Sequence, residues 1–74
     1  MSRPVKRSFS IKGHRTSISL EAEFWVALKD AAAEDNVALA GLISVIDKER
    51  GSSGLSSAVR VWLLHRYQAR TKPL

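Results

Sequence analysis

Cysteine is absent from the 74 residues of this chain, so neither disulfides nor thiolate metal sites can stabilise its fold. Long apolar runs are also missing: the most apolar window, Val37 to Ile46, has ten residues, which is too short to cross a bilayer. A chain this short usually needs disulfides, metal or a partner for adequate stability. Oligomerisation is therefore the remaining route, and the absence of cysteine fits a reducing cytoplasm.

Acidic residues are missing from both ends of the chain. Residues 1–20 carry five lysines and arginines, and residues 50–74 carry five more, with no acid in either segment. All seven acids lie within residues 21–49, beside only two lysines. A basic segment beside a strand is the electrostatic footprint of a nucleic-acid binder, while the alternative is a solvated tail that promotes solubility. The first basic segment has no apolar core, so we expect no signal peptide.

The residue patterns that catalysis or metal binding requires are also missing. His14 and His65 are far apart in sequence and lack a cysteine or second histidine at ligand spacing, so we predict no metal site. The sequence shows no arrangement of nucleophile, base and acid, and no glycine-rich loop that would hold a phosphate. We therefore predict no catalytic residues, no cofactor and no enzymatic activity.

One stretch, His14 to Leu20, alternates strictly between apolar and polar residues, and it is the only strand signal of useful length. The two sets fall on opposite faces: Thr16, Ile18 and Leu20 on one, and Arg15, Ser17 and Ser19 on the other. This period of two is that of a half-buried β-strand. A lone strand has no partner within the chain, and one solution is pairing with the same strand of a second copy. The resulting ribbon would present its polar row to the DNA major groove, which admits a two-stranded ribbon.

The residues before this strand are predicted to begin with a flexible basic arm, residues 1–8. Phe9 and Ile11 then alternate at odd positions, whereas the apolar residues of the strand stand at even positions. A continuous strand cannot place both sets on one face. Gly13 therefore marks a bulge or a tight reversal, unless Phe9 and Ile11 belong to a disordered arm.

Three helices are predicted after the strand, over residues 22–35, 39–50 and 55–70, in one domain of residues 9–74. Their apolar stripes and the strand supply the expected dimer core: Ile18, Leu20, Phe24, Leu28, Leu42, Ile43 and Ile46. Trp25 lies next to the stripe of the first helix, where it covers the edge of the core or joins a dimer interface. Val61 and Leu64 fall outside the main stripe of the third helix, so more than one side of that helix is apolar.

A basic arm, one strand with alternating polar positions and two helices resemble the ribbon-helix-helix superfamily of bacterial DNA-binding proteins. The closest likeness is to small stand-alone members with a strand of the form Gly-His-Arg-Thr-Ser-x-Ser-Leu-Glu, here Gly13 to Glu21, and a Phe-Trp pair, here Phe24 and Trp25. They also carry a late Leu-Ser-Ser-Ala-x-Arg segment, here Leu55 to Arg60. The likeness covers residues 9–66. It implies a mainly α fold with one β-strand: an intertwined homodimer with an intermolecular two-stranded antiparallel ribbon, plus an additional C-terminal helix.

The resemblance implies three base-contacting residues on the outward strand face: Arg15, Ser17 and Ser19. An arginine fork can donate twice to guanine, and serine can bind several base edges. Phosphate contacts are expected from three basic residues and, by the resemblance, from backbone N–H groups at the start of the second helix: Lys6, Arg7, Lys12, Ala38, Leu39 and Ala40. Family members often have Ser or Thr at that helix cap, whereas Ala38 has no side-chain oxygen.

The sequence therefore predicts a homodimeric, sequence-specific DNA-binding protein, most simply a transcriptional regulator of the bacterial cytoplasm that joins the nucleoid when bound to DNA. Its partners would be double-stranded DNA and a second copy of itself, with no membrane. The alternative is a dimeric protein-interaction module, or an antitoxin-like partner, that uses the third helix to bind another protein. This alternative rests on the apolar surplus of that helix.

Overall fold

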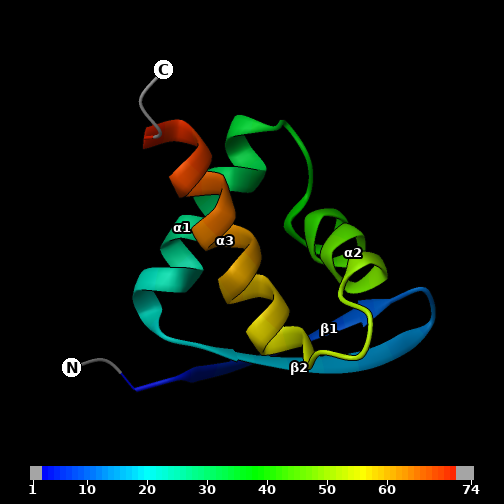
Figure 1. Ribbon diagram of the computed structural model, residues 1–74. Helices are drawn as coiled ribbons and strands as arrows, with labels where there is room; N and C mark the ends of the chain where they lie inside the picture. The colour runs from blue at the N-terminus through cyan, green and yellow to red at the C-terminus, as the bar shows by residue number, and fades with distance from the viewer. Residues whose placement is uncertain (1–2, 72–74) are drawn as a thin grey trace.

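The computed structural model describes residues 3–71, which form a β-hairpin covered on one side by three helices (Figure 1). The hairpin consists of β1 (Val5–Ile11) and β2 (His14–Leu20). The helices are α1 (Ala22–Glu34), α2 (Leu39–Glu49) and α3 (Leu55–Thr71). In Figure 1, α1 leaves the open end of the hairpin, α2 lies over the turn end, and α3 packs against both helices.

β2 pairs with β1 of the same chain, so the prediction that this strand lacks a partner within the chain is wrong. The pairing is antiparallel and runs from Val5 opposite Leu20 to Ile11 opposite His14. The predicted arm is too long, because β1 begins at Val5; Met1 and Ser2 lie outside the described residues. The described chain thus forms two strands rather than one, and a two-stranded antiparallel ribbon exists before any second chain is added.

A two-residue turn at Lys12 and Gly13 joins the strands and explains the shift in alternation. Their φ angles are +51° and +80°, and positive φ at both central residues is the pattern of type I′ turns, whose twist suits hairpins. Of the alternatives for Gly13, the tight reversal is therefore the correct one. Because odd positions of β1 stand opposite even positions of β2, Phe9, Ile11 and Ile18 all lie on the inner face.

The inner face of the hairpin packs against the helices to form one core. Its buried residues are Ile11, Ile18, Leu20, Trp25, Leu28, Ala31, Ala32, Leu42, Ile43, Ile46, Val59 and Leu63. All the residues predicted for a dimer core are among them except Phe24, which is partly buried. Their burial therefore does not require a second copy of the chain.

Trp25 of α1 contacts β1 through a hydrogen bond and through ring stacking. Its side chain is only 3% exposed, and its Nε1–H donates to the Val5 carbonyl oxygen at 2.9 Å. Its ring stacks on Phe9, with the two ring centroids 5.9 Å apart. A buried indole usually finds such an acceptor for its N–H group. Trp25 therefore belongs to the core of the single chain and holds β1 against α1.

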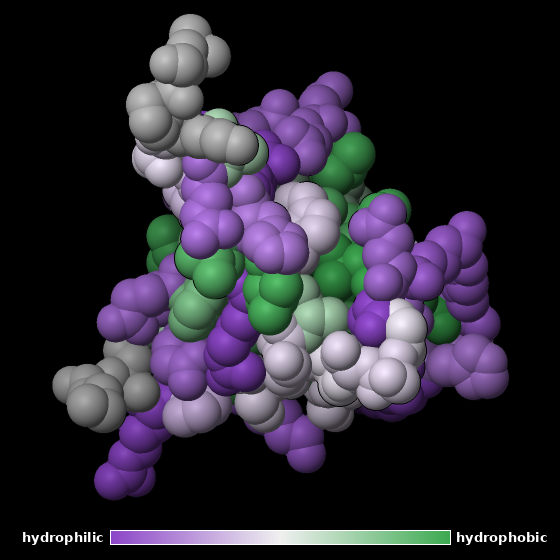
Figure 2. Space-filling model, viewed as in Figure 1, coloured by the Kyte–Doolittle hydropathy of each residue, from purple (hydrophilic) through white to green (hydrophobic). Residues whose placement is uncertain are grey.

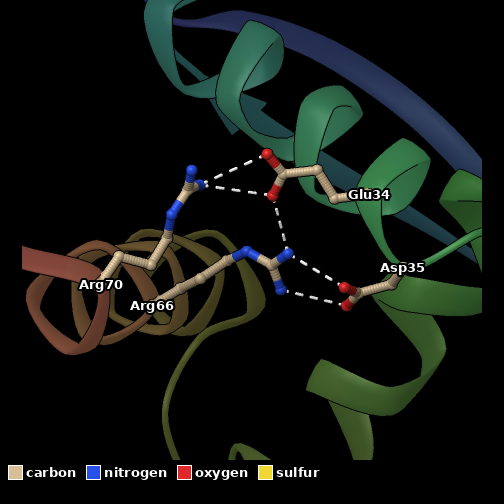
Figure 3. Close-up of polar contacts among 4 residues, drawn as sticks. All are labelled: Glu34, Asp35, Arg66 and Arg70. Carbon is tan, nitrogen blue, oxygen red and sulfur yellow. Dashed lines mark hydrogen bonds and ion pairs between the residues drawn. The ribbon is translucent and has the colours of Figure 1, made fainter.

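Ion pairs join the C-terminal ends of α1 and α3 (Figure 3). Arg66 donates to both carboxylate oxygens of Asp35, each at 3.0 Å, and to Glu34 at 2.9 Å. Arg70 lies 3.3 Å from the same Glu34 oxygen. Hydrogen bonds from Arg66 are the main cause that lowers the pKa of both carboxyl groups. This network links the C-terminal end of α3 to that of α1.

Candidate nucleic-acid interface

The hairpin presents a polar and basic face on the side away from the helices. On this face Lys6 stands opposite Ser19, Ser8 opposite Ser17, and Ser10 opposite Arg15. Five of these six residues are exposed, and the sixth, Ser19, is half-buried. Purple and white residues line the lower margin of Figure 2, where Figure 1 places the hairpin. The face offers hydroxyl and cationic groups, and neither strand carries a carboxylate.

The structure brings the three predicted base contacts into one row along β2. Arg15 lies near the turn, Ser17 at the middle of the strand and Ser19 near the open end. Alternate residues of a strand lie roughly 7 Å apart, which is about two base steps of a DNA strand. The row therefore has the spacing to face every second base pair, and base contact by these residues stays a prediction.

Ser19 is held at its backbone by α3. Its N–H donates to the Ser56 hydroxyl at 3.0 Å, and its carbonyl oxygen accepts from Arg60 at 3.1 Å. Arg60 also donates to Glu21 from two nitrogens, at 3.0 and 3.1 Å. The pKa of Glu21 is lowered by a hydrogen bond from its own backbone and then by Arg60.

These contacts give a role to residues that the sequence did not assign to the site. Ser56 and Arg60 belong to the late Leu-Ser-Ser-Ala-x-Arg segment, and Glu21 closes the strand motif. Both segments belong to the motifs shared with the ribbon-helix-helix superfamily, and this was the signal in the sequence that could have pointed to these residues. No pattern in the sequence predicts that the two segments contact each other. Arg60 and Ser19 are separated by 41 positions in the chain.

The basic residues predicted to contact phosphate fall in different places. Lys6 lies on the outer face of the hairpin, exposed. Arg7 is also exposed but lies on the inner face, where its guanidinium carbon is 5.3 Å from the centroid of the Trp25 ring. Lys12 is exposed at the turn, and the neighbouring Lys48 of α2 is the main cause that lowers the pKa of Lys12. Lys12 and Lys48, which the sequence did not group, concentrate positive charge at the tip of the hairpin.

The start of α2 has the backbone of a helix N-terminus but no side-chain cap. Ala38 is the N-cap, with φ −68° and ψ 148°, and its carbonyl accepts from the Leu42 N–H at 3.0 Å. Ala38 and Ala40 are exposed, and Leu39 is half-buried. The first turn of α2 contains no acidic residue, so no carboxylate there would repel an anion. Phosphate binding at this end stays a prediction.

A second exposed surface, the α1–α3 groove, is apolar. It has a volume of about 350 Å³ and is lined by Glu23, Phe24, Ala27, Arg60, Val61, Leu63, Leu64 and Tyr67. Three of its apolar side chains are well exposed: Val61 at 46%, Leu64 at 53% and Tyr67 at 39%. Figure 2 shows green, apolar residues gathered over α1 and α3. Contiguous exposed apolar surface of this kind often marks an interaction site.

Comparison with known protein families agrees with this geometry. The ribbon-helix-helix domain family matches residues 4–67, so the chain belongs to that family and the resemblance seen in the sequence is confirmed. Domains of this family generally bind DNA, dimerise and regulate transcription, and they are typically not enzymes. No curated protein and no solved structure matched the chain. Within residues 3–71, no helix has the length and apolar character needed to cross a membrane.

Proposed function

We propose that this protein is a sequence-specific DNA-binding protein that regulates transcription by placing its β-hairpin in the major groove. One observation carries the proposal: the inner face of the hairpin is mainly apolar, whereas the outer face is entirely polar or basic. Apolar side chains occupy most of the inner face, while the outer face carries hydroxyls and cations and no carboxylate. The major groove is about 12 Å wide and admits a two-stranded ribbon. The outer side chains can therefore approach base edges without disturbing the core.

In this proposal, base contacts and phosphate contacts come from different residues. Arg15 would donate both ends of its guanidinium fork to guanine O6 and N7, while Ser17 and Ser19 offer single hydroxyls. Lys6, Arg7 and Lys12, with the backbone N–H groups at the start of α2, would contact phosphates and position the hairpin. Cations at the hairpin supply affinity that falls as salt concentration rises.

The homodimer predicted from the sequence remains part of the proposal, on a different basis. An unpaired strand no longer supports it, because β2 pairs with β1. The general behaviour of the family supports it instead. Two associated chains would read two half-sites, as dimeric DNA-binding proteins do, and would sit on the nucleoid of a bacterial cell. Analytical ultracentrifugation at micromolar concentration should show a dimer; a monomer both free and on DNA would remove this part of the proposal.

Fluorescence anisotropy with a duplex selected from a random pool, and with scrambled duplexes, tests the proposal. Arg15→Ala should cost about 1–3 kcal/mol of binding on the selected duplex and relax the preference at one base position per half-site. Arg7→Ala is the matched control, because it removes the same charge from the inner face. It should weaken binding to all duplexes alike and flatten the salt dependence. An intact protein that prefers no duplex from the pool would contradict the proposed function.

The α1–α3 groove favours a second candidate function, a protein-interaction module or antitoxin-like partner that binds another protein through α3. The supporting observation is the exposure of Val61, Leu64 and Tyr67 beside the partly buried Phe24. Leu64→Asp should abolish such binding while leaving DNA binding intact, since Leu64 lies outside the hairpin. Capture of the same partner by the wild type and by Leu64→Asp would remove the groove as the docking site.

A further inference from the structure

α3 holds the end of β2 by its backbone, through contacts that do not involve β1. The N–H of Ser19 donates to the Ser56 hydroxyl at 3.0 Å, and the Ser19 carbonyl oxygen accepts from Arg60 at 3.1 Å. Both backbone groups of one residue are thus bonded to side chains of a single helix. A recognition site is most precise when a second set of residues holds the groups that contact the ligand. These two bonds therefore give α3 a direct influence on where the Ser19 side chain lies.

Arg60 is itself fixed by two neighbours. Its Nε and Nη2 both donate to Oε1 of Glu21, at 3.1 and 3.0 Å, and Glu21 follows directly after β2. Its guanidinium carbon lies 5.8 Å from the centroid of the Phe24 ring in α1. An arginine held by a carboxylate and an aromatic ring has its donors already oriented, so it loses little freedom when it bonds a further group. The hydrogen bond to the Ser19 carbonyl therefore comes from a side chain that is already held in place.

Ser19 needs such support more than the rest of its row does. It is the last outward residue of β2, next to Leu20, where the strand and its pairing with β1 end. Ser17 lies at the middle of the strand, with paired residues on both sides. Backbone at the end of an element opens more readily than backbone in its middle. The contacts from α3 therefore act at the outward position of β2 that the strand pairing holds least.

We propose that Arg60 and Ser56 are positioning residues for DNA recognition, which fix the Ser19 backbone so that the Ser19 hydroxyl meets one base position. This inference rests on the proposed function. A hydrogen bond weakens steeply as its geometry departs from the ideal distance and angle, so a base edge is discriminated only while Ser19 keeps its place. Loss of the support should therefore reduce base discrimination at the position that Ser19 faces. It should spare the position that Arg15 faces, at the other end of the row.

Arg60→Met tests the inference in the full chain, because methionine keeps a straight side chain and removes every donor. Fluorescence anisotropy gives discrimination at each base position, as the ratio of the affinities for the selected duplex and for a duplex with that base pair changed. Ser19→Ala and Arg15→Ala identify the positions that these two residues read. Arg60→Met should lose about 2- to 10-fold in discrimination at the Ser19 position, the effect expected for one hydrogen bond, and keep it at the Arg15 position.

Arg66→Met is the matched control. Arg66 is also half-buried on α3, and its guanidinium carbon lies 5.5 Å from the centroid of an aromatic ring, that of Trp62. It donates to acidic residues as Arg60 does, but these are Glu34 and Asp35 at the end of α1. The two variants lose the same charge and similar contacts, and only Arg60→Met changes the support of Ser19. Arg66→Met should therefore keep the discrimination of the wild type at every base position.

Three further variants distinguish a positioning role from a merely structural one. Combined with Ser19→Ala, Arg60→Met should cause no further loss at the Ser19 position, because the hydroxyl that it positions is gone. Arg60→Lys keeps the charge and a donor for the Ser19 carbonyl, so it should restore part of the discrimination. Ser56→Ala removes the acceptor of the Ser19 N–H, so discrimination at the Ser19 position should fall and the Ser19 amide should exchange faster with solvent.

The outcomes separate this inference from the function on which it rests. If Arg60→Met lowers discrimination equally at all positions, or no more than Arg66→Met does, Arg60 does not act through Ser19; the inference is overturned and the proposed function stands. The same conclusion follows if Ser19→Ala loses discrimination at no position while Arg15→Ala does, or if Arg60→Met adds its full effect to that of Ser19→Ala. If the wild type itself prefers no duplex, the proposed function fails and the inference fails with it.

Discussion

The outer face of the hairpin and the α1–α3 groove are both exposed, but they are built in opposite ways. The outer face carries serines, lysine and arginine on a paired backbone. The groove carries mainly aliphatic and aromatic side chains on two helices. A polyanion such as DNA suits the first surface, and another apolar surface suits the second. The comparison teaches that exposure marks a candidate surface, while the chemistry of its side chains decides the partner.

The two surfaces also depend on different parts of the same core. Ile18 and Leu20 lie on the inner face of the hairpin and are fully buried, directly behind the outer row of β2. Val59 and Leu63 of α3 are buried behind the groove. Substitutions at neighbouring buried and exposed positions should therefore separate stability from binding on each surface.

The largest effect is expected for Ile18→Asp. Ile18 is 0% exposed, and an uncompensated charge at that position would cost several of the roughly 5–15 kcal/mol that stabilise a small domain. Circular dichroism should show no cooperative unfolding transition. Ser17→Asp is the matched control: the same charge on the outer face should leave the fold intact and abolish DNA binding. A cooperative melt for Ile18→Asp would show that the inner face is not part of the core.

The next largest effect should separate Leu63 from its neighbour Leu64. Leu63 is 1% exposed, so Leu63→Ala should destabilise the fold by about 2–5 kcal/mol. Leu64 is 53% exposed, so Leu64→Ala should change stability by less than about 0.5 kcal/mol. Urea denaturation gives both values. Equal losses for the two variants would mean that the groove is covered in solution, by a second copy or by another segment.

The helices could be predicted from the sequence because the spacing of their apolar residues is a local pattern. Leu42, Ile43 and Ile46 repeat at helical spacing, and all three are buried in α2. β1 could not be predicted as a strand, because two of its inward positions, Val5 and Arg7, remain exposed. Only Phe9 and Ile11 showed the alternation, and the strand is instead fixed by its turn and by its pairing with β2.

The candidate site likewise has one part that the sequence predicts and another part that it does not. The row of Arg15, Ser17 and Ser19 follows from alternation within one strand, so the sequence was enough to place these residues on one face. The neighbouring row on β1 depends on how β1 pairs with β2. In the sequence, the shift of the apolar residues from odd to even positions left two possibilities open, a bulge and a tight reversal. The bonds from Ser56 and Arg60 to Ser19 depend on tertiary packing across a separation of about forty residues, which no local pattern predicts.

A smaller loss of stability is expected for Trp25→Phe. Phenylalanine keeps a ring in the core but removes the Nε1–H that donates to the Val5 carbonyl, which should cost about 1–2 kcal/mol. Hydrogen exchange should quicken for the amides of β1 while those of α2 and α3 keep their protection. Trp62→Phe is the control, since that ring is only partly buried and does not contact β1 through such a bond. Unchanged exchange in β1 would show that Trp25 does not hold the strand.

The smallest effect should come from the ion pairs that link the C-terminal ends of α1 and α3. Hydrogen bonds from Arg66 lower the pKa of Glu34 and Asp35 in the folded chain. A carboxyl group with a lowered folded-state pKa stabilises the fold above its unfolded-state pKa, near 4, and this contribution is lost as the pH falls through the folded-state value.

Arg66→Gln removes the cause of these shifts. It should melt slightly below the wild type at pH 7, because exposed ion pairs contribute little, and the difference should shrink as the pH falls below about 4. Arg50→Gln is the control, because Arg50 pairs with Asp47 within the α2 end and not with α1. A wild type and Arg66→Gln that differ equally at pH 7 and pH 3 would show that the pairs do not stabilise the fold.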